Sequence, residues 1–306
     1  MLEGVTRRLF GPHDGGASSG GVPPRVPRLP RIGLAIGGGA ARGWAAIGIV
    51  RRLREAGIVP DVVAGTSMGA VVGACDLAGR LDALESFACE LTPRRVFSLL
   101  DLRFGGSGLV GGDRLAKLVV SHLDDIRVEE LGRPFTAVAT ELATGHEIWL
   151  NSGRLIDALR ASYALPGIFE PVRIGRRLLV DGALVNPVPV SVCRALGAEL
   201  VVAANLSTDT FAHGTVVQSL PAEAEDTASV DESFGQSLLR RLFGGNAEVP
   251  GLTGVMMESF NIIQDRITRS RLAGDPPDVM IAPRLGHIGL FDFHRAEEAI
   301  ALGVAA

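Results

Sequence analysis

Short apolar runs alternate with glycine-containing turns near the start of the chain. Residues 32–36 form an apolar run that leads into three consecutive glycines, a pattern typical of a buried strand followed by a tight turn. Apolar residues then recur at intervals of three and predict a helix from about residue 41 to 56, with Gly57 at its C-terminal end. Residues 61–64 predict a second strand, and a second glycine turn connects it to a helix that starts with residues 70–77.

This order of strand, helix, strand and helix favours an α/β fold with a parallel sheet covered on both faces. Further strands are expected at residues 135–140, 147–150, 177–181, 200–205 and 279–282. Further helices are expected at residues 113–122, 155–162, 188–196, 256–272 and 295–302.

Two segments lack the pattern of a packed element. Residues 1–30 are rich in glycine and proline and poor in apolar residues, so we expect a disordered tail. Residues 221–250 are acidic at first and then amphipathic, with apolar residues beside two arginines, and we expect a long mobile insertion that carries a short helix. The remaining chain, residues 31–306, is expected to form one domain.

The composition of the 306-residue chain is that of a globular protein, with 47% hydrophobic and 21% charged residues. Its 30 basic and 34 acidic residues give a formal net charge of -4. No basic excess is present to neutralise nucleic-acid phosphates, so no nucleic-acid partner is expected. Three cysteines are too few for a disulfide framework, which fits a reducing compartment.

The apolar runs also bear on location. No uncharged apolar run reaches the roughly 18 residues of a membrane span. The N-terminus has no continuous hydrophobic core of the kind found in secretion signals. A cytoplasmic protein is therefore expected, with peripheral contact to a membrane left open, and the sequence gives no indication of the oligomeric state.

Ser67 lies in the pattern G-x-S-x-G, within the turn between the second strand and its helix. A sharp strand-to-helix turn exposes a serine hydroxyl at the edge of the sheet and at the N-terminus of a helix, as a catalytic nucleophile requires. The alternative is that Ser67 only caps the helix that follows.

Gly37, Gly38 and Gly39 form the first glycine turn. Consecutive glycines before a helix leave backbone N–H groups open to an anion, which is either a phosphate or a developing oxyanion. The turn is not a P-loop because no G-K-[ST] follows, and the dinucleotide pattern G-x-G-x-x-G fails at Arg42. The alternative is that these glycines only permit close packing of helix and strand.

A serine hydrolase needs a base. None of the histidines lies in a turn that matches the context of Ser67, although the sequence excludes none of them; they are His13, His122, His146, His213, His287 and His294. Asp181 is the stronger candidate, because it ends an apolar strand and precedes Gly182. A carboxylate at a strand end of a parallel sheet is expected to point into the same crevice as Ser67, where it can act as base without histidine. The alternative is an ordinary Asp–Gly turn.

Four segments occur in the order IGGGAARGWAAIGIVRRL, AGTSMGAVVGA, RASYALPGIFEPV and LLVDGALVNPVPV. In these motifs the chain resembles the patatin-like phospholipases, and it is closest to their bacterial, neuropathy-target-esterase-like branch. The resemblance covers residues 31–206 and is weaker beyond. It implies a three-layer α/β/α fold with a mostly parallel central sheet, and a Ser–Asp dyad in place of a triad.

By this resemblance Ser67 is the nucleophile and Asp181 is the base, and Gly37, Gly38 and Gly39 form the oxyanion hole. The implied reaction is hydrolysis of fatty-acyl esters of phospholipids, lysophospholipids or related lipids, with no metal or other cofactor. Arg42 matches the basic residue that closes the family's glycine motif, and either binds a head group or pairs with an acid on a helix face.

Several hypotheses remain open at this point. Residues 221–250 form either a lid that faces the membrane or an ordinary surface helix. Ser162 and residues 165–167 are expected to have structural roles. The same nucleophile also suits an acyltransferase, which would need a histidine base within reach of Ser67. A lipid-binding or regulatory protein without turnover is the non-enzymatic alternative, and a nucleotide site at the glycine turn is the least favoured.

Overall fold

The structure is a computed structural model that describes residues 29–99, 108–110, 126–208 and 252–306. Residues 1–28 of the expected tail, the expected helix at 113–122 and the expected insertion at 221–250 lie outside the described residues. Both dyad candidates and the first glycine turn lie within them.

The central sheet contains eight strands in the order β10-β9-β1-β2-β4-β8-β7, with β5 also paired to β4. The strands are β1 (Ile32–Ile36), β2 (Val62–Thr66), β4 (Phe135–Glu141), β5 (Glu147–Leu150), β7 (Val172–Ile174), β8 (Arg177–Asp181), β9 (Leu200–Ala204) and β10 (Val279–Ile281). A second, small sheet pairs β3 (Gly108–Val110) with β6 (Gly167–Phe169).

The central sheet is mixed. The pairs β1–β2, β1–β9, β9–β10 and β2–β4 are parallel, whereas β5 and β8 run antiparallel to β4, and β7 runs antiparallel to β8. The expectation of a parallel sheet is therefore correct for the half of the sheet around β1 and β2. The other half is built from antiparallel strands.

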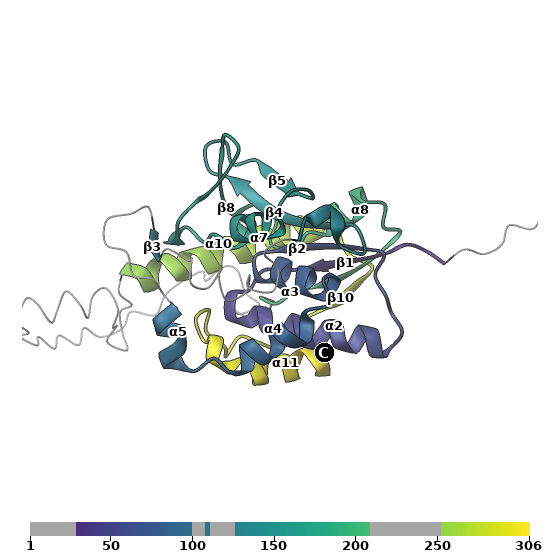
Figure 1. Ribbon diagram of the computed structural model, residues 1–306, viewed down its shortest axis with the longest axis horizontal. Helices are drawn as coiled ribbons and strands as arrows, with labels where there is room; N and C mark the ends of the chain where they lie inside the picture. The colour runs from purple at the N-terminus through teal and green to yellow at the C-terminus, as the bar shows by residue number, and fades with distance from the viewer. Residues whose placement is uncertain (1–28, 100–107, 111–125, 209–251) are drawn as a thin grey trace, which may run out of the picture.

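Helices cover both faces of the sheet, which confirms the three-layer α/β/α architecture (Figure 1). Leu34, Ile36 and Val63 point to one face, where they join a core with helices on that side. Ala35 and Val62 point to the opposite face, where the core includes residues of α8 (Val190–Ala195). Both strands are buried on both faces, which explains their continuous apolar runs.

The helices lie close to where the apolar periodicity predicts them. They are α2 (Ala45–Glu55), α3 (Met68–Leu77), α4 (Leu81–Cys89), α5 (Pro93–Leu99), α7 (Leu155–Tyr163), α8 (Val190–Ala195), α10 (Leu252–Gly274) and α11 (Ala296–Ala305). Short 3-10 turns are η1 (Ala40–Trp44), η2 (Val128–Glu130), η3 (Gly182–Leu184) and η4 (Phe293–Arg295). The sequence analysis did not predict α4, α5, β3, β6 or β7, and the three strands are too short to show an alternating pattern.

The start of the first helix differs from the expectation. The chain first forms the 3-10 turn η1, and α2 begins only at Ala45. Ala40 has a φ of 47°, a left-handed conformation that no regular α-helix contains. The glycine turn therefore extends one residue beyond Gly39, and the chain needs η1 to reorient before the helix starts.

Candidate active site

Ser67 lies at a strained turn between β2 and α3, with φ 54° and ψ -127°. This conformation is costly for a residue with a Cβ and typically marks a functional position. A Cβ at Gly65 would collide with the backbone of Ala70, and one at Gly69 would collide with the carbonyl oxygens of Ile36 and Gly37. Close backbone contact on both sides of the serine therefore explains the spacing G-x-S-x-G.

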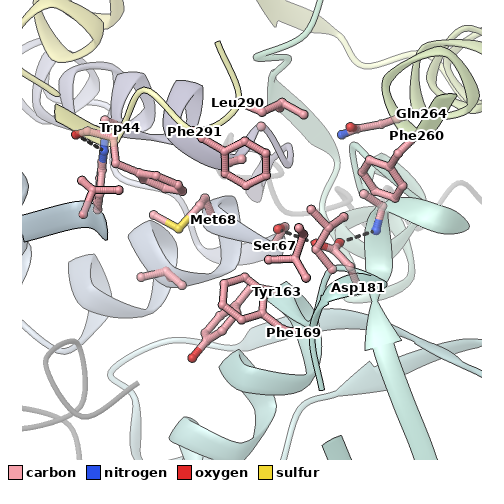
Figure 2. Close-up of a pocket in the computed structure, with 18 of the residues that line it drawn as sticks. Trp44, Ser67, Met68, Tyr163, Phe169, Asp181, Phe260, Gln264, Leu290 and Phe291 are labelled. Atoms are coloured by element: carbon pink, nitrogen blue, oxygen red, sulfur yellow. Dashed lines mark hydrogen bonds between the residues drawn. The ribbon is translucent and has the colours of Figure 1, made fainter. Parts of the chain in front are cut away.

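The hydroxyl group of Ser67 points to Asp181 and not to the start of the helix. Ser67 makes no side-chain capping bond to α3. Its Oγ instead donates to Oδ2 of Asp181 over 2.7 Å, and both residues are buried (Figure 2). The interpretation of Ser67 as a helix cap alone is therefore wrong.

Asp181 is held by bonds on both its side chain and its backbone. Its Oδ1 accepts the backbone N–H of Ala183 over 2.8 Å, and its main-chain carbonyl accepts the Thr140 hydroxyl over 2.8 Å. Its backbone N–H donates to the carbonyl of Ala164 over 2.9 Å. The carboxylate thus has one oxygen engaged by the backbone and the other directed at Ser67.

Two strands that run in opposite directions bring these residues together. β2 runs parallel to β4 and ends with Thr66 opposite Val138. β8 runs antiparallel to β4 and ends with Asp181 opposite Ala139, the next residue of β4. Residues of β4 that pair with β2 or with β8 also pair with β5, so β2 and β8 share the other edge of β4. The expectation that Asp181 ends a parallel strand is therefore wrong, and the two strands meet end to end.

Burial sets the pKa of Asp181. Loss of solvent around the carboxylate raises its pKa from 3.8 to about 6, against the lowering effects of the Ala183 N–H and the Ser67 hydroxyl. A carboxylate with a pKa near 6 is ionised at neutral pH and is a stronger base than an exposed aspartate.

Ser162 supports the backbone of the nucleophile turn. Its Oγ accepts the N–H of Ser67 over 2.9 Å and donates to the carbonyl of Val138 over 2.6 Å. The side chain is fully buried on α7. The sequence analysis expected Ser162 to be structural, and the structure shows which bond it supplies: it links the strained turn to β4.

The glycine turn lies beside Ser67, and two of its three N–H groups are already bonded. Gly37 N–H donates to the carbonyl of Ala204 over 2.9 Å, and Gly38 N–H donates to that of Pro187 over 3.0 Å. No acceptor among the described residues is bonded to the N–H of Gly39, which lines the pocket at Ser67. Of the three glycines expected to form an oxyanion hole, only Gly39 has an N–H that no described residue accepts, while the N–H groups of Gly37 and Gly38 hold the turn.

Arg42 has a role that the sequence analysis did not anticipate. It is 4% exposed, and its Nε donates to the carbonyl of Ile288 over 2.8 Å. The neighbouring Ala41 N–H donates to the carbonyl of Leu290 over 3.0 Å. Arg42 does not line the pocket in the described part of the chain. The head-group role is thus corrected: because η1 turns the side chain into the interior, Arg42 anchors the segment that carries Leu290 and Phe291.

The pocket in front of the dyad is strongly apolar. It has an empty volume of about 1050 Å³, which includes solvent at its mouth. Among the described residues that line it, Asp181 is the only carboxylate, and no histidine is present. Apolar and aromatic side chains make up most of the wall, among them Trp44, Met68, Tyr163, Phe169, Phe260 and Phe291 (Figure 2).

Gln264 and Phe260 enter this pocket from α10, and the sequence analysis named neither. The helix was predicted at residues 256–272, but none of its residues was named as a candidate for the site. A signal was present: Gln264 is an uncharged amide one turn after Phe260, on the buried face of the helix. A polar residue within an apolar stripe is a candidate for a site.

The other reactive or ligating groups of the described chain do not form a second centre. Burial raises the pKa of the Cys75 and Cys193 thiols to about 12, so both stay protonated. Within the described ranges, no three His, Cys, Asp or Glu residues are grouped so that they could hold a metal ion. None of the helices described is both long and apolar enough to cross a bilayer.

Comparisons with known protein sequences agree with the motifs. Residues 34–194 match the family model described as patatin-like phospholipase. An uncharacterized NTE family protein of Mycobacterium tuberculosis is 33% identical over 323 aligned positions, which cover 90% of each chain. The rat patatin-like phospholipase domain-containing protein 7 is 32% identical over 184 positions, 58% of this chain and 14% of that protein.

Among solved structures, VipD from Legionella pneumophila is similar to this chain with a TM-score of 0.45 and 14% identity, over 92% of this chain and 66% of VipD. The family assignment rests on the sequence matches, which extend over half of the chain for the family model and nearly all of it for the mycobacterial relative. This chain belongs to the patatin-like phospholipase family.

Proposed function

We propose that this protein is a serine esterase that hydrolyses fatty-acyl esters of phospholipids, lysophospholipids or related lipids. Membership of the patatin-like phospholipase family implies lipid acyl hydrolase activity. The observation that carries the proposal is the 2.7 Å hydrogen bond from Ser67 Oγ to Asp181 Oδ2 at the wall of an apolar pocket.

The first half of the proposed reaction acylates Ser67. Asp181 takes the hydroxyl proton as Ser67 Oγ attacks the ester carbonyl carbon. The carbonyl oxygen becomes an oxyanion, and the Gly39 N–H donates a hydrogen bond to it. The bond to the alcohol then breaks, and the protonated Asp181 returns the proton to the leaving alkoxide.

The second half releases the fatty acid. Water enters the position of the alcohol, and Asp181 accepts one of its protons while the oxygen attacks the acyl carbon. The bond to Ser67 Oγ breaks, and the proton on Asp181 returns to the serine. Nothing in this sequence of steps requires a metal or a cofactor.

The pocket wall supports an acyl chain as the bound group. Aromatic and aliphatic side chains surround the dyad, and burial of a fatty chain against them is favourable by roughly 0.8 kcal/mol for each methylene. We therefore expect rates on simple esters to rise with acyl length until the pocket is filled.

The alternatives have less support. An acyltransferase that uses a histidine base would need that residue at Ser67, and the described histidines His146, His287 and His294 do not line the pocket. A nucleotide site at the glycine turn would need free N–H groups, and those of Gly37 and Gly38 are bonded. A lipid-binding protein without turnover has no need for a hydrogen-bonded dyad.

Peripheral membrane contact is also part of the proposal. The outer face of α10 exposes Val255, Met256, Ile262 and Ile263, and Arg266 is exposed nearby on the same helix. Phe260, at the border between this exposed face and the buried face of the helix, lines the pocket. An apolar helix face with a cation beside it suits the surface of an anionic bilayer, and here it would place the pocket close to its lipid.

The test is hydrolysis of p-nitrophenyl esters of increasing acyl length by the wild type, Ser67→Ala and Asp181→Asn. We expect turnover by the wild type and near-background rates for both variants. Loss of activity in Ser67→Ala with activity retained in Asp181→Asn would place the base elsewhere. A wild type that hydrolyses no ester and does not react with a fluorophosphonate at Ser67 would contradict the proposal.

The membrane part has a separate test. Co-sedimentation with vesicles of phosphatidylcholine and phosphatidylglycerol is compared between the wild type and the double variant Ile262→Ser/Ile263→Ser. We expect weaker sedimentation of the variant and an unchanged rate on a short soluble ester. Equal sedimentation of the two proteins would overturn the assignment of α10 as the contact surface.

A further inference from the structure

Gln264 is a buried amide that faces the pocket. It is 4% exposed and lies on α10 one turn after Phe260 (Figure 2). Its main-chain carbonyl accepts the Thr268 hydroxyl over 2.7 Å. Its side-chain carboxamide, in contrast, forms no hydrogen bond with any other residue that the structure describes. The carboxamide lines the pocket wall near Ser67, so its N–H groups can donate to a ligand bound in the pocket.

The space in front of Gly38 shows where the Gln264 amide lies relative to Ser67. A Cβ placed on Gly38 would lie 3.4 Å from Nε2 of Gln264 and 3.4 Å from the Cβ of Ser67. The amide nitrogen and the nucleophile therefore border the same small space, which stays open because residue 38 has no side chain. A substrate carbonyl attacked by Ser67 has to fit beside this space.

The hydrogen-bonding state of the glycine turn strengthens the argument. Gly37 and Gly38 donate to main-chain carbonyls, which leaves Gly39 as the one glycine of the turn with no described acceptor. Oxyanion holes typically combine two or more donors, and side-chain amides serve in this role in other hydrolases. Among the three glycines only Gly39 keeps an N–H for an oxyanion, and Gln264 is a neighbouring side chain that can supply a further donor.

We propose that the Nε2–H group of Gln264 donates to the substrate's carbonyl oxygen as it becomes an oxyanion, together with the N–H of Gly39. This inference rests on the proposed esterase function. Gln264 would be a catalytic residue that touches the reacting atoms, with no covalent step of its own. An uncharged donor suits this place, because a cation would lower the pKa of Asp181 and weaken it as a base.

The test compares Gln264→Met and Gln264→Glu with the wild type in steady-state hydrolysis of a soluble p-nitrophenyl ester. Methionine keeps the length of the side chain without a donor. Glutamate keeps the shape and places a carboxylate where negative charge develops. Loss of one oxyanion donor lowers kcat by about 100- to 1,000-fold, so we expect a loss of this size in Gln264→Met, a larger one in Gln264→Glu, and a nearly constant KM in both.

A matched control is available on the same helix. Asn261 is also a buried carboxamide on α10, but its Nδ2 is bonded to Glu258 over 3.3 Å and it does not line the pocket. Asn261→Leu is expected to lower the melting temperature and leave kcat within about threefold of the wild type, since the expected 100-fold loss belongs to an oxyanion donor alone. A loss of kcat in Asn261→Leu equal to that in Gln264→Met would assign the effect to helix packing and overturn the proposal.

A trifluoromethyl ketone gives a second readout, because its adduct with Ser67 carries the oxyanion. Its affinity should weaken in Gln264→Met by the same factor as kcat/KM, whereas a substrate-like ester should bind unchanged. Near-normal kcat in a folded Gln264→Met or Gln264→Glu would refute the role of Gln264. Full activity of Ser67→Ala in the same assay would instead refute the esterase proposal, so the two failures are distinguishable.

Discussion

The two residues of the proposed dyad come from halves of the sheet that are built differently. Ser67 follows β2, in the parallel half, and its turn is specified by the glycines on both sides of it. Asp181 ends β8, in the antiparallel half, and its environment comes from α7, β4 and the Ser67 turn. The geometry at Ser67 is therefore set by residues close to it in the sequence. The burial and hydrogen bonds of Asp181 depend instead on contacts from distant parts of the chain.

The first prediction has the largest expected effect. It compares Ser67→Ala, in the parallel half of the sheet, with Asp181→Asn, in the antiparallel half, in covalent labelling by a fluorophosphonate. A fluorophosphonate needs Ser67 Oγ as its attachment site, so Ser67→Ala should abolish labelling completely. Asp181→Asn keeps the nucleophile and removes the base, which contributes roughly 100- to 10,000-fold to such reactions. Gel-based labelling over time should show slow reaction of Asp181→Asn, and equal rates in this variant and the wild type would contradict the role of Asp181.

The second prediction concerns stability on the Asp181 side. Burial holds the folded-state pKa of Asp181 at about 6, above 3.8 for the unfolded chain, so the folded state binds the proton more tightly. Between these values the stability contributed by this group falls as pH rises, by about 3 kcal/mol in total. Asp181→Asn should therefore unfold at a higher temperature than the wild type at pH 8.

The difference in stability should shrink as the pH approaches 4, where the wild-type carboxyl is also neutral. Thermal unfolding of both proteins over this pH range measures it. A variant that is less stable than the wild type at pH 8 would show that the carboxylate is not the destabilising group in the folded protein.

The pH dependence of activity is the third prediction. Only the ionised form of Asp181 can accept the serine proton, so kcat/KM should fall about tenfold for each pH unit below about 6 and level off above it. Stopped assays from pH 4.5 to 8 with a soluble ester test this. A profile that stays flat down to pH 4.5 would mean that Asp181 keeps an ordinary aspartate pKa.

The fourth prediction has the smallest expected effect and concerns the free energy of unfolding. It compares the hydroxyl of Ser162, which bonds to the Ser67 backbone, with that of Thr140, which bonds to the Asp181 backbone. Ser162 both accepts the N–H of Ser67 and donates to Val138, whereas Thr140 donates once, to the main-chain carbonyl of Asp181. A lost hydrogen bond costs about 1 kcal/mol, so Ser162→Ala should lose roughly twice as much free energy of unfolding as Thr140→Val. Urea unfolding measures both, and a larger loss in Thr140→Val would reverse the comparison.

Much of the parallel half could be predicted from the sequence. The bounds of β1 agree with the apolar run at residues 32–36, and the turn around Ser67 agrees with its glycine pattern. The reason is that strands buried on both faces have continuous apolar runs, and tight turns need glycine at fixed positions. The antiparallel half was harder to predict, because β7 has only three residues and shows no alternating pattern.

The candidate site was likewise predictable from the sequence only in part. The sequence named Ser67 and Asp181, but it treated the strand of Asp181 as parallel. For Arg42 it offered either a head-group role or a pairing with an acid on a helix face, and not the bond to the Ile288 carbonyl. It missed Gln264, whose role depends on α10 crossing the pocket more than 190 positions after Ser67 in the chain. No local pattern encodes which main-chain N–H groups of the glycine turn find acceptors, since Ala204 and Pro187 are remote in sequence.

The sequence alone determined the class of fold, the family and the two candidate residues of the dyad, because apolar periodicity, glycine spacing and motif order are local properties. The tertiary structure decided the rest: the end-to-end meeting of β2 and β8 on one edge of β4, the burial that raises the pKa of Asp181, the anchoring role of Arg42, and the N–H of Gly39 that no described residue accepts. Each of these depends on which distant groups exclude water or supply a hydrogen-bond partner, and only the packed chain brings those groups together.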